Sequence, residues 1–86
     1  MRVQDIAKGL TKAGLKKMSW NTKENCIKGD YEIREINYNG IHSYVSVNHG
    51  VFNKEQRGVT IDKVVVILND LGLNTKEVKG IIQILK

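Results

Sequence analysis

DYEIREINYNGIHSYVSVN, residues 30–48, is the stretch on which the fold of this chain depends. At its centre Asn39-Gly40 separates two runs rich in Tyr, Ile and Val, and both residues tolerate the positive φ angles of a type I′ turn. Pairing through this turn sets Tyr38 opposite Ile41. The stretch therefore predicts a β-hairpin, and we expect the rest of the chain to cover it.

The two arms of this hairpin share one core face only if the register slips once. Tyr31 and Ile33 lie on the opposite parity from Ile36 and Tyr38. A β-bulge at Arg34-Glu35 would restore the phase. We therefore predict that bulge, with Ile33 opposite Val45, Tyr31 opposite Val47, Ile36 opposite Ser43, and an outer face that carries Asn37, His42, Tyr44 and Ser46.

An amphipathic helix is predicted before the hairpin, from about Val3 to Ala13. Its apolar side chains recur at helical spacing and leave lysines on the opposite face. Gly14 suits the left-handed residue just past a helix, and Leu15 suits the hydrophobic contact of a Schellman-type stop. The helix is therefore expected to end there.

A second helix is predicted to begin at Thr60, a good N-cap, with Asp62 in the first turn where the helix dipole favours negative charge. A Leu-Gly-Leu stop at residues 71–73 resembles the one at 13–15. The β-branched run at residues 64–67 would also suit a buried strand, which is the alternative.

The C-terminal residues are predicted to form a third helix. Asn74 and Glu77 have the spacing of a capping box. The apolar stripe of this helix, which runs to the C-terminus, consists of Val78, Ile81, Ile82 and Leu85. Ile84 lies at the edge of the stripe, so we expect an uncovered apolar side, as in a protein that forms a homodimer.

The signal between residues 16 and 29 is weak. A short strand near Glu24 to Lys28 would make the sheet a three-stranded meander. Trp20, the only tryptophan, is expected to anchor this segment onto the sheet, with stacking on a ligand as the alternative.

These elements predict one α+β domain, residues 1–86, in the order αββ(β)αα or αβββαα. A small antiparallel sheet of two to three strands is covered on one face by the N-terminal helix and two C-terminal helices. Residues 48–59 form a loop in this prediction, with Val51 and Phe52 in the core. We find no internal repeat, low-complexity tract or linker.

Positive charge is concentrated near the N-terminus. The formal net charge is +5, and residues 1–29 hold seven Lys and Arg against two Asp and Glu, 7 − 2 = +5. A one-sided basic field favours polyanions such as nucleic acid, or an acidic protein surface. The alternative is that these lysines only solvate a surface helix.

Cys26 is the one cysteine, which rules out an intrachain disulfide, and no apolar run approaches the ~20 residues needed to cross a bilayer. We therefore expect a cytoplasmic protein without membrane contact. Cys26, His42 and His49 lack the spacing of a zinc site, so we expect no metal and no cofactor. Cys26 is expected in the core rather than as the nucleophile of a cysteine–histidine pair.

Two histidines offer an enzymatic alternative. A histidine can cleave RNA without a metal ion, as general base on the 2′-hydroxyl or general acid on the leaving oxygen, when cations hold the phosphate nearby. His42 on the sheet and His49 at its end are the candidates. Their other interpretation is as plain surface histidines.

The segments VSVNHG at residues 45–50 and KEQRGVTIDKVVVILNDLGLNTKEV at 54–78 resemble the second half of small HicA-type toxins. The first helix, ending in Ala-Gly-Leu, is also similar. The resemblance implies a fold like the double-stranded-RNA-binding domain (helix, three strands, helix), messenger-RNA cleavage and a cognate antitoxin. The Gly-Ser-His-type motif of that family has no counterpart between Leu15 and Asp30.

Two hypotheses of function follow. The first is a small basic accessory protein of toxin–antitoxin or phage type that binds nucleic acid, RNA rather than DNA. Its phosphate contacts would be Lys8, Lys12, Lys16, Lys17 and Lys23. The second is a protein-interaction module or inhibitor that binds an acidic host protein, through the same lysines or through the outer sheet face at His42 and Tyr44.

Overall fold

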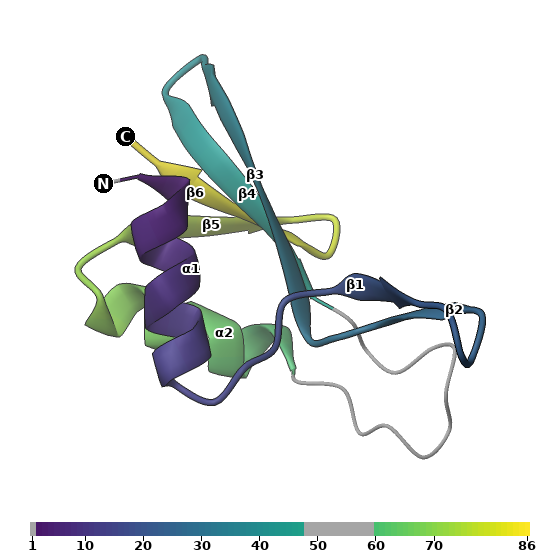
Figure 1. Cartoon of the computed structure of the whole chain (residues 1–86). Helices are drawn as coiled ribbons and strands as arrows, with labels where there is room; N and C mark the ends of the chain where they lie inside the picture. The colour runs from purple at the N-terminus through teal and green to yellow at the C-terminus, as the bar shows by residue number, and fades with distance from the viewer. Residues whose placement is uncertain (1, 48–59) are drawn as a thin grey trace.

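Two helices pack on one face of a four-stranded antiparallel sheet, and a two-stranded ribbon projects beside the sheet (Figure 1). The structure is a computed structural model that describes residues 2–47 and 60–86. Its elements are α1 (Val3–Lys12), β1 (Ser19–Asn21), β2 (Cys26–Lys28), β3 (Tyr31–Tyr38), β4 (Ile41–Val47), α2 (Ile61–Asp70), β5 (Asn74–Val78) and β6 (Ile81–Leu85). The loop predicted at 48–59, with His49, Val51 and Phe52, lies outside the described residues. No helix in the described ranges is long and apolar enough to span a bilayer.

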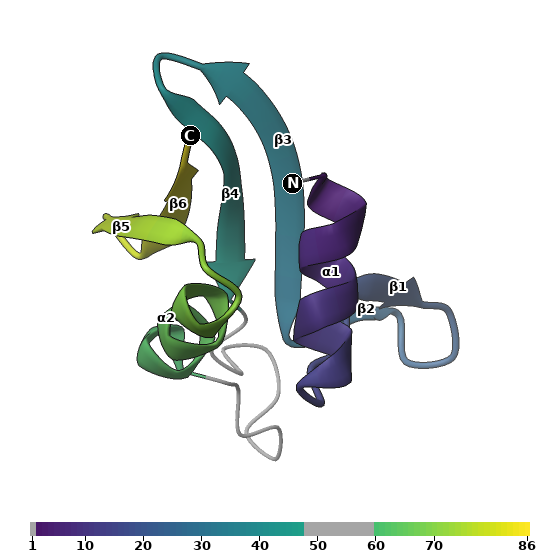
Figure 2. The same ribbon diagram turned by 90° about the vertical axis from the view of Figure 1, so that its left-hand side faces the viewer.

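The strand order of the larger sheet is β3-β4-β6-β5, so the hairpin of residues 31–47 forms one half of the sheet and the C-terminal strands form the other. Figure 2 shows α1 beside β3 and α2 beside the C-terminal strands. The molecule is α+β as predicted, but the prediction of one small sheet under three helices is wrong.

The third helix is the main error, because residues 74–85 form a β-hairpin. Lys79 and Gly80 have φ angles of 51° and 81°, the combination of a two-residue type I′ turn. Ile82 and Ile84 point inward at strand spacing, and Ile84 is only 1% exposed. The uncovered apolar side expected at Ile84 is therefore absent, and the homodimer stays a prediction without that support.

The first hairpin follows the sequence closely. Asn39 and Gly40 have φ angles of 52° and 78°, and Tyr38 lies opposite Ile41. Pairs Tyr31–Val47 and Ile33–Val45 are confirmed.

The bulge of this hairpin lies two residues later than predicted. Glu35 rather than Ile36 faces Ser43, and the register shifts between Glu35 and Tyr38, with Asn37 at a φ of 50°. Ile36, beside Tyr44 on the outer sheet face, and Tyr38, next to the hairpin turn, are both exposed. This end of the hairpin extends past α1 (Figure 1).

Both helix stops have the predicted form. Leu15 N donates to Leu10 O over 3.1 Å, and Leu73 N donates to Leu68 O over 3.2 Å, the long hydrogen bond of a Schellman motif. The glycines before these leucines, at residues 14 and 72, have positive φ angles. At the start of α2, Lys63 N donates to Thr60 Oγ1 over 3.3 Å, which confirms Thr60 as the N-cap.

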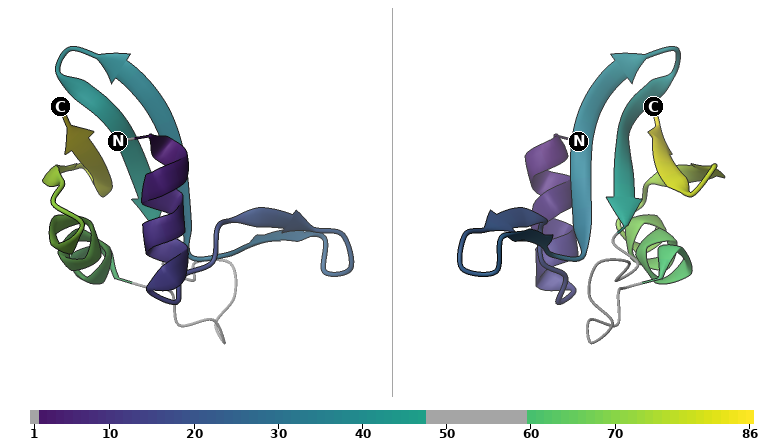
Figure 3. Two further views of the ribbon diagram at one scale, coloured as in Figure 1. Left: turned by 60° about the vertical axis from the view of Figure 1, so that its left-hand side comes forward. Right: turned by 90° about the vertical axis from the view of Figure 1, so that its right-hand side faces the viewer.

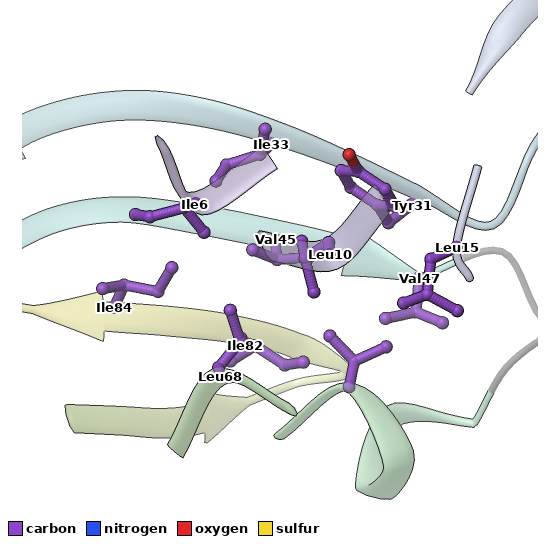
Figure 4. Packing of buried hydrophobic residues seen from close by; sticks show 11 residues of the cluster. Ile6, Leu10, Leu15, Tyr31, Ile33, Val45, Val47, Leu68, Ile82 and Ile84 are labelled. Carbon is purple, nitrogen blue, oxygen red and sulfur yellow. The ribbon is translucent and has the colours of Figure 1, made fainter. Parts of the chain in front are cut away.

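The core lies between the helices and the inner face of the sheet (Figure 4). The Tyr31 hydroxyl donates to Ala7 O over 3.1 Å, which ties α1 to β3. A methyl group at Gly9 would lie 2.6 Å from Leu71 Cδ1, so the Leu71 side chain packs directly over this glycine of α1 and would have to move to admit a larger residue. The buried apolar residues are Ile6, Leu10, Leu15, Tyr31, Ile33, Val45, Val47, Val64, Leu68, Ile82 and Ile84.

The described chain contains the same order twice, a helix followed by a hairpin. In α1 and α2 the buried positions Ile6 and Leu10 correspond to Val64 and Leu68, with the same four-residue spacing. Each helix ends in a Gly-Leu stop, and each hairpin turns through a residue and a glycine with positive φ. The two halves share the spacing of their buried residues and turns but not the identity of those residues, so no repeat is evident in the sequence.

The substitution Gly80→Ala should lower the free energy of unfolding by about 1–2 kcal/mol, because alanine resists the left-handed conformation at this turn. In a helix interior the same change would raise stability by roughly 1 kcal/mol. Urea denaturation measures the sign of this change in the free energy of unfolding. Gly40→Ala is the matched control, since both glycines have similar φ angles and open surroundings. A stabilising Gly80→Ala would contradict the hairpin.

Candidate nucleic-acid interface

The β1–β2 ribbon projects from the body of the molecule (Figure 3). Its register pairs Ser19 with Lys28, Trp20 with Ile27, and Asn21 with Cys26. The predicted strand at residues 24–28 thus exists as β2, but it pairs with β1 in a separate sheet. It does not extend the main sheet as a third strand of a meander.

The turn of the ribbon is closed by local polar contacts. Asn21 Oδ1 accepts a hydrogen bond of 3.0 Å from Glu24 N, and Asn25 has a φ of 53°. Glu24 and Lys28 form an ion pair four residues apart. Local hydrogen bonds of this kind are typical of Asn in turns, so the sequence itself favours a turn here.

The base of the ribbon is held against the start of β3 by hydrogen bonds. Lys16 N donates to Asp30 Oδ2 over 2.7 Å, and Asp30 N donates back to Lys16 O over 2.7 Å. Met18 N donates to Tyr31 O over 2.7 Å. A methyl group at Gly29, whose φ is 135°, would lie 2.5 Å from Met18 Cα. Only glycine allows these two chain segments to come so close.

A basic hollow of about 270 Å³ lies at this base, lined by Lys16, Lys17, Ser19, Lys28, Gly29 and Asp30. Lys16 and Lys17 are exposed and form no ion pair within the described ranges. The Asp30 carboxylate accepts the Lys16 amide, and Lys28 is paired with Glu24. Positive charge therefore exceeds negative charge in the hollow.

The other predicted lysines lie elsewhere. Lys8 and Lys12 are exposed one turn apart on α1, and Lys23 lies in the turn at the far end of the ribbon. None of the three lines the basic hollow. Sequence reasoning missed Lys28, which only the strand register sets beside the base of the ribbon.

Two expectations for this segment are wrong. Trp20 does not anchor it to the sheet, because its side chain lies on the projecting ribbon and is 57% exposed. Cys26 is partly buried on β2 and is not part of the core. Trp20 is exposed and Cys26 lies outside the core because the ribbon is separate from the main sheet.

The histidine candidates are not brought into a catalytic arrangement by the described residues. His42 Nδ1 lies 3.0 Å from Ser43 Oγ, a fully buried hydroxyl, and His49 is outside the described ranges. No group of three or more His, Cys, Asp or Glu side chains in residues 2–47 and 60–86 could hold a metal ion.

The outer face of the sheet has a different character. Tyr44 lies opposite Arg34 and Gln83 and contributes to a hollow of about 250 Å³ lined by Ile36, Tyr44, Val78, Lys79, Ile81 and Gln83. His42 is not part of it. Arg34 Nε donates to Glu32 Oε1 over 2.8 Å, and this hydrogen bond, with the carboxylate charge, raises the pKa of Arg34.

Comparison with protein families, curated proteins and solved structures finds no match for this chain. The resemblance to HicA-type toxins therefore stays a prediction. The observed element order differs from the helix, three strands, helix that the resemblance implies, since two strands follow α2.

The substitution Gly29→Ala should detach the base of the ribbon, because the new methyl group overlaps Met18 and the Lys17 carbonyl. We expect it to cost roughly 1–3 kcal/mol more than Gly14→Ala, the control with a positive φ but open surroundings. Urea denaturation measures the difference, and amide exchange at Met18 and Tyr31 locates it. Equal effects at the two glycines would contradict the close contact.

Proposed function

We propose that this chain binds nucleic acid, with RNA as the expected ligand, through the base of the β1–β2 ribbon. The observation that carries this proposal is the basic hollow, in which Lys16 and Lys17 are exposed and form no ion pair within residues 2–47 and 60–86, and Lys28 lines the same hollow. Lysines gathered in this way attract phosphates and release the counterions that surround them.

Lys8 and Lys12 on α1 and Lys23 in the ribbon turn are exposed outside the hollow and are proposed as further phosphate contacts. Contacts from lysines to phosphates position a protein on a nucleic acid without reading its bases. The proposed binding is therefore dominated by charge, with little dependence on sequence from these residues alone.

The role as an accessory protein of toxin–antitoxin or phage type, and a cytoplasmic location, are part of this proposal. The first rests on the resemblance of residues 45–50 and 54–78, and the second on the single cysteine. Metal-independent RNA cleavage is the enzymatic variant. It requires His42 or His49, so a His42→Ala, His49→Ala double variant with unchanged cleavage would remove it.

A protein-interaction module is the second candidate, favoured by the apolar hollow around Tyr44. Ile36 and Ile81 are both exposed beside this tyrosine on the outer sheet face. Exposed apolar groups that lie together are typical of protein-binding surfaces. An acidic protein that binds the lysines would use the basic hollow, which shares no lining residue with the hollow around Tyr44, so the two surfaces are separable by substitution.

The double variant Lys16→Ala, Lys17→Ala should weaken binding to single-stranded RNA and lower the slope of log K against log salt by about 1.4, because two phosphate contacts are lost. Filter binding or fluorescence anisotropy across a salt series measures both. The matched control is Lys63→Ala, Lys76→Ala, which changes net charge equally at exposed lysines of α2 and β5.

The proposal is wrong if no DNA or RNA is retained at low salt. Equal weakening by the two double variants would show that charge acts diffusely rather than through the basic hollow. A Tyr44→Ala variant that weakens binding more than the Lys16 and Lys17 changes would instead identify the outer sheet face as the working surface.

A further inference from the structure

The ribbon exposes two large apolar side chains to solvent. Trp20 is 57% exposed and its cross-strand partner Ile27 is 52% exposed. Directly paired residues of an antiparallel ribbon project on the same face, so these two side chains are neighbours. Together with Asn25 and Cys26 they line a hollow of about 260 Å³.

The fold does not need this apolar pair. In the second half of the chain, Leu73 of the helix stop leads directly into β5 at Asn74. In the first half, the segment of residues 16–30 with its ribbon stands between Leu15 and β3. The core contains neither Trp20 nor Ile27, so their exposure is not a by-product of closing the core.

Charge around the ribbon indicates what the tryptophan would contact. Lys28 follows Ile27 in β2, Lys23 lies in the turn, and Lys16 and Lys17 lie at the base. An exposed aromatic side chain on a ribbon that also carries lysines in its turn and at its base matches a nucleotide, in which a flat base is linked to an anionic phosphate. A purely apolar protein partner would gain nothing from these lysines.

Successive residue pairs of the ribbon project on alternate faces, and this arrangement favours single strands over duplexes as ligands. The pair Trp20–Ile27 and the adjacent pair Ser19–Lys28 project on opposite faces. A strand whose base stacks on Trp20 and whose phosphate meets Lys28 must pass around the edge of the ribbon. A flexible single strand can bend in this way, whereas the bases of a duplex are already stacked and paired.

We infer that Trp20 is a stacking platform for an unpaired base of single-stranded nucleic acid, with the lysines at the ribbon base holding the neighbouring phosphates. Ile27 supports the indole from the paired strand. This inference rests on the proposed function and makes it more specific, since it names the form of the ligand and the residue that meets the base.

Trp20 is the only tryptophan, so its fluorescence reports on this position alone. The full-length protein is titrated with oligo-uridine, with oligo-deoxythymidine and with a duplex of equal length, under excitation selective for tryptophan. The single strands should quench the emission through stacking, and the duplex should not at the same salt concentration. The two single-stranded arms distinguish RNA from DNA as the preferred source of the base.

The substitution Trp20→Ala should weaken binding of a labelled single strand by roughly 5- to 150-fold, the range for loss of one stacked base. Fluorescence anisotropy of the labelled strand measures this. The slope against log salt should stay unchanged, because the phosphate contacts remain. Trp20→Phe should recover most of the affinity. Tyr38→Ala is the matched control, an aromatic residue 68% exposed at the other end of β3, and should leave affinity unchanged.

Unquenched emission, together with full affinity in Trp20→Ala, would overturn the inference while the salt-dependent binding of the proposed function stands. Loss of all binding to every oligonucleotide would overturn the proposed function itself. A blue shift with vesicles of anionic lipid, without quenching by nucleic acid, would assign the exposed pair to a membrane surface and also overturn the inference.

Discussion

The pairing of β4 with β6 is the interaction on which the rest of the structure depends. It joins two hairpins that are separated along the chain by α2, and it gives both strands partners on each side. Val45 lies opposite Ile82 and Ser43 opposite Ile84, and all four side chains are buried under the helices. Without this pair each hairpin would be a two-stranded ribbon with a single helix against it, and a two-stranded ribbon alone is at best marginally stable in water.

The two helix-and-hairpin halves that this strand pair joins differ in one segment, and that segment carries the proposed binding residues. Each half supplies a helix, a Gly-Leu stop and a hairpin with a left-handed turn. Only the first half carries an additional segment between its helix and its hairpin, and that segment holds the lysines of the basic hollow together with Trp20. The segment of residues 16–30 contributes no residue to the described core, and the ribbon is fixed to the rest of the fold by the contacts at Gly29 and Asp30.

Local signals in the sequence were sufficient for about half of the fold. Asn39-Gly40 specified its turn, Gly14-Leu15 specified a helix stop, and Thr60 specified a cap, because each depends on a few neighbouring residues. The last twelve residues show the limit of such signals. The helix prediction places Ile82 in a helical stripe, Ile84 at its uncovered edge and Lys79-Gly80 within the helix, whereas both isoleucines are inward positions of a strand and Lys79-Gly80 is a turn. The deciding partner, β4, lies about forty residues away.

The sequence alone determined the α+β class, the register of the first hairpin around Tyr31 and Ile33, and the concentration of lysines near the N-terminus. Only the tertiary structure decided that residues 74–85 are strands, that Trp20 faces solvent, and that Lys28 joins Lys16 and Lys17. The reason is physical: turns and caps are satisfied within a few residues. The choice between helix and strand for an apolar segment is made by the surface that buries it, which here comes from distant parts of the chain.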